Sequence, residues 1–237
     1  MKKLALAVTL LTAATGGAAV EIDLETLGDL SQKQFQQLSE DLGAALSYKA
    51  LAPAEPLGIT GFDLGVELTN TSLANSEAFE LATGEELGSL PVPKVHLHKG
   101  LPFNVDVGAL YAAVPGSDMK LTGFELRYAF IEGGIATPAV AVRGTWSNLS
   151  GVDELDLTTK GVELTVSKGI AMVTPYAGIG QVWVDSNANV TGLKDEELTL
   201  GKYYAGLNLN LGLTNFAVEF DQTGEASSVG AKLGFRW

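Results

Sequence analysis

Apolar and polar side chains alternate through most of the sequence, in runs of about ten residues. The stretch TGFELRYAF shows the pattern: Phe124, Leu126 and Tyr128 alternate with Glu125 and Arg127. Successive side chains of a β-strand point to opposite faces, so each run predicts a strand with one apolar and one polar face. Such runs are longer than most strands of soluble proteins and match the roughly 9–11 residues with which a strand crosses a bilayer.

Eleven candidate runs can be counted, whereas a single-chain bacterial barrel needs an even number of strands. The runs start near Ala44, Ile59, Lys94, Phe103, Lys120, Pro138, Leu157, Val173, Thr199, Asn215 and Ser227. We exclude the first run, because residues 45–53 adjoin a predicted helix and a Pro-rich stretch. Short Gly-rich turns alternate with longer acidic connections, as is typical of membrane barrels. The predicted fold is an all-β, antiparallel transmembrane β-barrel of about ten strands, with a short N-terminal amphipathic helix.

The first residues have the pattern of a secretory signal peptide. Lys2 and Lys3 precede an apolar run, and small residues follow around residues 17–19. This pattern predicts a signal peptide over residues 1–19 that is cleaved near Val20; an uncleaved anchor is the alternative. The apolar run is shorter than the roughly 20 residues that a membrane-spanning helix needs.

Residues 20–57 predict a helix followed by extended chain. Ser31 is a candidate N-cap with Gln34 as its capping-box partner, so an amphipathic helix is expected from Gln32 to about Leu42. The narrow apolar stripe of this helix suits packing against another surface. The segment is expected either to plug the lumen of a barrel formed by residues 58–237 or to lie beneath that barrel in the periplasm.

The last residues, SSVGAKLGFRW, carry the alternation to a terminal aromatic. With the signal peptide and the alternating runs, this ending resembles that of bacterial outer-membrane β-barrels, in the size class of the small OmpA-, OmpX- and OmpW-like proteins. The resemblance implies a location in the bacterial outer membrane and contact with outer-membrane lipid and lipopolysaccharide. It also implies that the barrel assembly machinery recognises Phe235 and Trp237.

Charged side chains of both signs occupy the polar faces at similar depths. They are Glu125, Arg127, Arg143, Glu163, Glu219 and Lys232. In a narrow barrel they predict an ion-paired lumen, whereas in a soluble β-sandwich or lipocalin-like barrel, the alternative fold, they would form a solvated face. The aromatic residues favour the membrane barrel, because they sort into two girdles. One girdle contains Phe62, Phe103, Phe130, Tyr176, Phe216, Phe235 and Trp237, and the other contains Tyr111, Trp146 and Tyr203.

Few residues of the sequence are candidates for catalysis or metal binding. His96 and His98 in VHLH share one face, as a metal-ligand pair would, but Lys94 and Lys99 disfavour a cation, so we interpret both histidines as lining residues. Nucleophile, phosphate-binding and zinc motifs are absent from the sequence. We expect no catalytic residues, no cofactor and no metal, although the acidic connections leave divalent cation binding open. The formal charge of −13, about −15 without the two signal lysines, argues against nucleic acid as a partner.

A ten-stranded barrel encloses little more than its own side chains, which argues against a general porin. The expected function is that of a non-enzymatic outer-membrane barrel with a structural or surface-interaction role. A narrow gated channel or transporter for a small or hydrophobic solute is the alternative, with the N-terminal helix as its candidate gate. A lipid-modifying enzyme that uses His96 or His98 is the third hypothesis.

Overall fold

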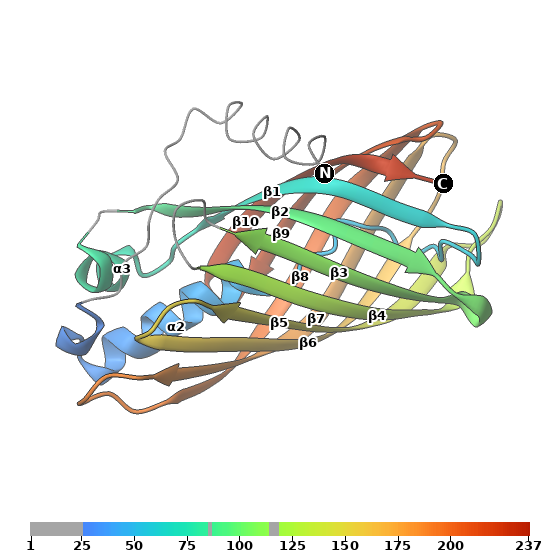
Figure 1. The fold of residues 1–237 in the computed structure, drawn as a ribbon. Helices are drawn as coiled ribbons and strands as arrows, with labels where there is room; N and C mark the ends of the chain where they lie inside the picture. The colour runs from blue at the N-terminus through green and yellow to red at the C-terminus, as the bar shows by residue number, and fades with distance from the viewer. Residues whose placement is uncertain (1–25, 85–86, 114–118) are drawn as a thin grey trace.

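Ten antiparallel strands form one closed barrel in the computed structural model, which describes residues 26–84, 87–113 and 119–237 (Figure 1). The predicted fold is therefore confirmed; the predicted signal peptide lies outside the described residues. The strands are β1 (Phe62–Ser72), β2 (Ser89–Gly100), β3 (Val105–Ala113), β4 (Lys120–Glu132), β5 (Ala139–Ser150), β6 (Leu155–Ser167), β7 (Val173–Ala188), β8 (Glu196–Leu211), β9 (Thr214–Thr223) and β10 (Ala226–Arg236).

The barrel has two distinct ends. The end that we call the Trp237 end contains Phe62, Trp237 and the turns 101–104, 133–138, 168–172 and 212–213. The opposite end, which we call the α3 end after the helix α3 (Ser76–Thr83), contains residues 73–84 and 87–88 and the connections 151–154, 189–195 and 224–225. Two connections that the sequence predicted to be long and acidic are shorter than predicted, because β5 to β8 continue to pair beyond the predicted strand ends, as Asp156 does with Asn187.

The seam between β1 and β10 closes the barrel. The Phe62 amide donates to the Trp237 carbonyl (3.0 Å), and the Trp237 amide donates to the Phe62 carbonyl (3.1 Å). The two aromatic rings are stacked with their centroids 5.3 Å apart. Closure gives every strand two neighbouring strands in the sheet, which is the condition for a sheet to stand in hydrocarbon.

Large apolar side chains cover the outer face of the barrel. Leu126, Leu164, Leu207, Val218 and Leu233 each expose about half of their surface. Soluble proteins do not expose a continuous apolar surface of this extent, whereas lipid tails solvate it. Since the polar side chains of the same strands point inward, the soluble alternative with apolar residues inside is wrong. The protein is a membrane β-barrel.

Most of the predicted aromatic girdle residues point outward. Phe103, Phe130 and Phe235 are exposed at the Trp237 end. Tyr176 differs from the prediction: its side chain points into the lumen and is 4% exposed. Its ring occupies space above Gly206, where a Cβ atom would lie 2.4 Å from the Tyr176 ring. An inward tyrosine needs a cross-strand neighbour without a side chain, which the alternation of one strand does not reveal.

The described residues also contain the helices α2 (Gln32–Leu46) and α3 (Ser76–Thr83) and the 3₁₀ turns η1 (Leu27–Asp29) and η2 (Pro102–Asn104). None of these described helices is long and apolar enough to cross a membrane.

The N-cap of α2 is the capping box that the sequence predicts. The Ser31 side chain accepts from the Gln34 amide, and the Gln34 side chain accepts from the Ser31 amide. The helix continues to Leu46, past its predicted end, because Ala44 and Ala45 are good helix formers that are buried inside the barrel.

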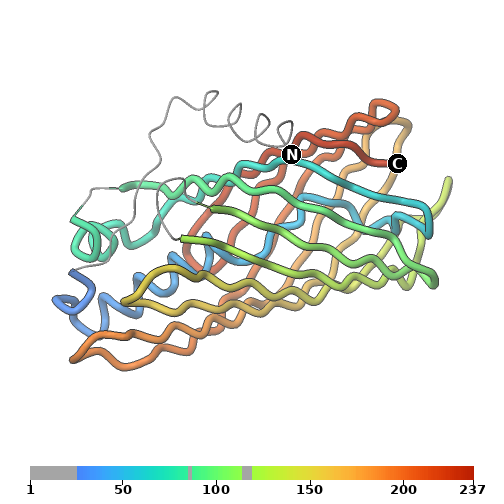
Figure 2. Tube along the Cα trace, viewed as in Figure 1, coloured from blue at the N-terminus to red at the C-terminus, as the bar shows by residue number. Residues whose placement is uncertain are grey.

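Most of the segment formed by residues 32–57 lies inside the barrel (Figures 1 and 2). Helix α2 occupies the lumen at the α3 end, and the extended chain of residues 47–61 continues through the lumen toward the Trp237 end, where β1 begins. We call residues 32–57 the plug. The polar inner face of the barrel therefore faces the protein's own backbone.

Candidate functional site

The lumen is the candidate site, because the buried polar and charged groups of the protein gather there. At the α3 end, α2 is attached to the wall and to the β1–β2 connection. The Ser39 hydroxyl donates to the Ser186 hydroxyl of β7 (2.8 Å). The Asp41 carboxylate accepts from the amides of Ala74 (3.1 Å) and Asn75 (2.7 Å), at the start of α3. Gly43 lets the helix approach the wall, since a Cβ atom there would lie 2.5 Å from Val184 Cγ2.

Wall side chains bind the backbone of the plug along the length of the lumen. The donor–acceptor pairs are Ser147 Oγ to Leu46 O (2.8 Å), Lys202 Nζ to Tyr48 O (3.0 Å), Lys94 Nζ to Lys49 O (3.3 Å), Arg143 Nη2 to Ala52 O (3.2 Å) and Arg127 Nη1 to Pro53 O (2.6 Å). An extended segment that pairs with no strand leaves its backbone carbonyls without hydrogen bonds, and buried carbonyls need partners. The lumen supplies these partners from four charged side chains and the Ser147 hydroxyl.

Plug amides are satisfied in the same way. The Ala54 amide donates to the Ser167 hydroxyl (3.1 Å), and the Leu57 amide donates to Asp106 Oδ1 (3.1 Å). A hydrogen bond from or to a charged group contributes about 1.5–3 kcal/mol, so several such bonds hold the segment firmly. The plug is thus bound through its backbone by side chains of many strands.

The wall charges nearly balance each other. The buried acidic wall residues are Asp63, Glu67, Asp106, Glu125, Glu163, Glu219 and Asp221. The buried basic wall residues are Lys94, Arg127, Arg143, Lys202 and Lys232; Lys49 of the plug is buried with them, and Arg236 is largely buried. A charge in a low-dielectric interior needs a partner, and this composition provides one for most of the ions.

Arg143 is at the centre of this network. Its guanidinium lies 3.1 Å from Glu125 Oε2 and 3.0 Å from Glu163 Oε2. Glu163 in turn accepts from Lys202 (2.6 Å). The same two cations, Arg143 and Lys202, donate to plug carbonyls, so the ion pairs orient the groups that bind the plug.

The six charged residues predicted from the sequence all line the lumen. Glu125, Arg143 and Glu163 lie together, Arg127 pairs with Asp106 (2.7 Å), and Lys232 pairs with Asp63 (2.9 Å). Glu219 is also buried, but no ion pair joins it to the described residues. The six did not include other charged members of the lumen, among them Lys49, Asp63, Asp106, Lys202 and Asp221. Lys49 had no detectable signal, because it lies in the plug, outside any alternating strand.

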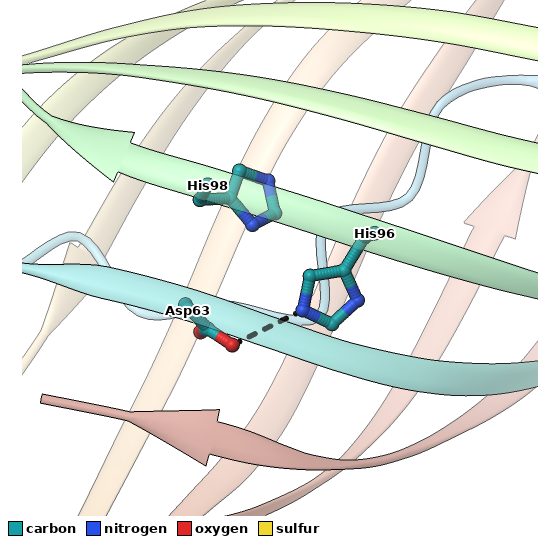
Figure 3. A group of neighbouring side chains, drawn as sticks. All are labelled: Asp63, His96 and His98. Carbon is teal, nitrogen blue, oxygen red and sulfur yellow. Dashed lines mark hydrogen bonds and ion pairs between the residues drawn. The ribbon is translucent and has the colours of Figure 1, made fainter. Parts of the chain in front are cut away.

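The two histidines lie in the wall on β2, beside β1. His96 and His98 are 3% and 2% exposed, respectively, and both point into the lumen, away from lipid. Asp63 of β1 lies opposite His98 in the strand register. One donor atom from each of these three residues lies within 4.8 Å of the other two (Figure 3). Lys99 is outside the cluster: its ammonium donates to the carbonyls of Gly61 and Gly100 at the Trp237 end.

Solved structures with a similar fold are membrane barrels of low identity. Neisserial surface protein A is 10% identical, with 74% of this chain and 94% of that chain covered and a TM-score of 0.32. The β domain of the Bordetella autotransporter BrkA is 12% identical, with 75% and 100% covered and a TM-score of 0.44. The attachment invasion locus protein Ail of Yersinia pestis is 12% identical, with 75% and 97% covered and a TM-score of 0.29. Likenesses at this level do not assign a role to the chain.

Comparison of the sequence with protein families and with curated proteins identifies the family of the chain but no curated relative. No curated protein matches the sequence. The family model matches residues 57–237, which is the barrel together with the last residue of the plug. The chain belongs to DUF6588, a family of unknown function.

Proposed function

We propose that the protein is an integral outer-membrane β-barrel whose lumen is closed by its own N-terminal segment, with a non-enzymatic structural or surface-interaction role. The observation that carries the proposal is the set of hydrogen bonds from wall side chains to plug carbonyls. A lumen that binds backbone at successive depths leaves no continuous path for a solute. The outer membrane is the membrane in which closed antiparallel barrels of this kind occur in bacteria.

The proposed orientation places the Trp237 end in the periplasm and the α3 end outside the cell. Barrels of this class have short periplasmic turns and longer external connections, and the longest connection, residues 73–88, carries α3. Acidic residues gather at the α3 end and include Glu77, Glu80, Asp153, Glu154, Asp195 and Glu225. The surface offered to a partner outside the cell is therefore acidic, formed by α3, the start of α2 and the connections around them.

The proposed partners follow from the two exposed surfaces. The apolar outer face contacts outer-membrane lipid, and the α3 end reaches the level of lipopolysaccharide. Assembly of such a barrel uses the barrel assembly machinery, for which Phe235 and Trp237, exposed beside the β1–β10 seam, are the proposed signal. The negative charge of the chain disfavours nucleic acid.

Planar-bilayer recording tests the closed lumen. Wild-type protein is expected to insert without a stable conductance, and a variant lacking residues 26–56 is expected to conduct, because the wall then encloses water. Heat-dependent SDS-gel mobility shows that both proteins are folded barrels. A steady conductance from folded wild-type protein would contradict the proposal.

A gated channel is the second candidate. The observation that favours it is that residues 47–57 add no strand to the sheet, so their release would leave the hydrogen bonds between the strands intact. Recording under voltage and across a range of ionic strengths separates the two candidates. Reversible openings of wild-type protein that vanish when the plug is cross-linked to the wall would support a gate, whereas a silent wild type supports permanent closure.

A further inference from the structure

The geometry of Asp63, His96 and His98 points to a binding site for one divalent transition-metal ion in the wall of the lumen (Figure 3). All three side chains are buried, and their donor atoms converge from two adjacent strands. Two imidazoles and one carboxylate are a donor set that suits zinc, iron, cobalt and nickel ions. The site is independent of the proposed surface role.

One ring nitrogen of His98 has polar neighbours, and the other has no hydrogen-bond partner among the described residues. Its Nε2 lies 3.0 Å from the Tyr48 hydroxyl of the plug and 3.7 Å from Glu125 Oε2. Its Nδ1 is buried and has no hydrogen-bond partner among the described residues. A buried nitrogen without a partner is costly, and a metal ion would supply one.

In His96, both ring nitrogens have a carboxylate neighbour. Its Nδ1 lies 2.8 Å from Glu67 Oε1, and its Nε2 lies 3.1 Å from Asp63 Oδ1. Metal-binding histidines usually donate their other ring N–H to a carboxylate, which fixes the ring and the tautomer. Glu67 is placed to do this for His96, while Tyr48 and Glu125 are placed to do it for His98.

Asp63 is oriented by its second oxygen. Lys232 Nζ donates to Asp63 Oδ2 (2.9 Å), while Oδ1 faces His96. In the absence of metal, a proton on His96 Nε2 is donated in a hydrogen bond to Asp63 Oδ1. A metal ion bound to Nε2 would displace this proton to solvent. The net charge of the site would then rise by less than the charge of the ion.

The backbone leaves room for the two imidazoles. A Cβ atom at Gly108 would lie 2.1 Å from His98 Cδ2, and one at Gly65 would lie 2.8 Å from His96 Cε1. Both glycines lie on strands that flank β2, and each faces a histidine across a strand pair. The rings therefore fit because their neighbours lack side chains.

Positive groups next to the site compete with a cation. Lys94 lies 3.4 Å from Glu67, and Arg236 lies 3.8 Å from Asp63. The carboxylates Asp63, Glu67 and Glu125 oppose these charges, so an ion enters surroundings that already contain compensating anions. Because the plug covers the cluster through Tyr48, the ion is acquired as the chain folds.

Refolding of the untagged protein with cobalt tests the site. The protein is refolded from urea into detergent with one equivalent of Co²⁺ and then desalted. We expect about one bound ion per folded barrel and visible ligand-field absorption. The variant His98→Gln keeps a donor near Tyr48 but removes the Nδ1 ligand, and it is expected to retain no stoichiometric cobalt. Glu67→Gln is expected to bind about 10–100-fold more weakly.

Thr69→Val is the matched control, because Thr69 is a buried luminal residue on the same strand as Asp63. It is expected to bind cobalt as the wild type does. The proposal is overturned if folded wild-type protein retains no more cobalt than folded His98→Gln. If that variant does not fold, X-ray absorption of zinc-loaded wild type decides: imidazole scattering supports the site, and a shell of water alone, or no retained zinc, refutes it.

Discussion

Asp63 of β1 and Lys232 of β10 form a buried ion pair across the seam that closes the barrel, with 2.9 Å between Oδ2 and Nζ. Both side chains are inaccessible to solvent, so neither charge is hydrated if its partner is lost. The seam therefore depends on electrostatic pairing as well as on the backbone ladder of β1 and β10.

Lys232→Met is expected to lower the free energy of unfolding by about 3–5 kcal/mol, because Asp63 then loses its nearest cation. Urea titration in lipid vesicles, followed by tryptophan fluorescence, measures the change. The double variant Asp63→Asn/Lys232→Met serves as the control and is expected to recover part of the loss. Equal losses in the single and double variants would show that the charge on Asp63 is compensated elsewhere.

Close packing of α2 against the wall gives a second prediction. Gly43→Ala adds a methyl group 2.5 Å from Val184 Cγ2, and the resulting overpacking is expected to cost about 1–3 kcal/mol despite the higher helix propensity of alanine. Val184→Ala in the same chain removes the clash and is expected to restore most of the stability. If Gly43→Ala alone stabilises the barrel in urea titration, α2 does not lie this close to β7.

The α2 cap provides a third prediction, at the α3 end. Ser31→Ala removes the side chain that accepts from the Gln34 amide, so the first turn of α2 is expected to lose about 0.5–2 kcal/mol. Hydrogen exchange of the amides at the start of α2 should accelerate by the corresponding factor, whereas exchange in β4 stays unchanged. Ser31→Thr keeps the hydroxyl and is expected to retain most of the protection. Equal exchange in all three proteins would contradict the capping role.

The Asp41 carboxyl makes the attachment of α2 to the β1–β2 connection depend on pH. Burial, opposed by the hydrogen bonds from the Asn75 and Ala74 amides, raises the pKa of Asp41 above its usual value. A raised pKa in the folded state means that folding favours the protonated form. The contribution of Asp41 to stability is therefore full below its unfolded-state pKa and declines as pH rises through the folded-state pKa.

Urea titrations of wild type and Asp41→Asn at several acidic to neutral pH values measure this effect. The stability of the wild type relative to Asp41→Asn is expected to fall as pH rises. A difference between the two proteins that stays constant or grows with pH would contradict the raised pKa.

The strands and their apolar and polar faces were predictable, because the two-residue alternation of side chains determines both. The inward position of Glu125 and the outward position of Phe124 follow from alternation alone. The inward turn of Tyr176 did not follow, since it depends on Gly206 of the neighbouring strand. The path of residues 47–57 was equally hidden, because its backbone is held by the side chains of distant strands and its own sequence has no period.

The cluster around His96 shows the same limit. The sequence places Lys94 and Lys99 beside the two histidines and so argues against a cation. Register instead places Asp63 opposite His98, from where its carboxylate reaches His96, while Lys99 turns to backbone carbonyls at the Trp237 end. The register between neighbouring strands determines which charged side chains meet. The sequence of one strand does not reveal that register.

The position of the plug is the central claim, and an engineered disulfide tests it most directly. The chain contains no cysteine, and the hydroxyl oxygens of Ser39 in α2 and Ser186 in β7 are 2.8 Å apart. The double variant Ser39→Cys/Ser186→Cys is expected to form the cross-link in isolated membranes under mild oxidation, visible as a change in gel mobility that a reducing agent reverses. A control pair, Ser39→Cys/Ser228→Cys, is expected to stay reduced. A folded, heat-modifiable Ser39→Cys/Ser186→Cys protein that forms no cross-link would show that the N-terminal segment lies outside the lumen.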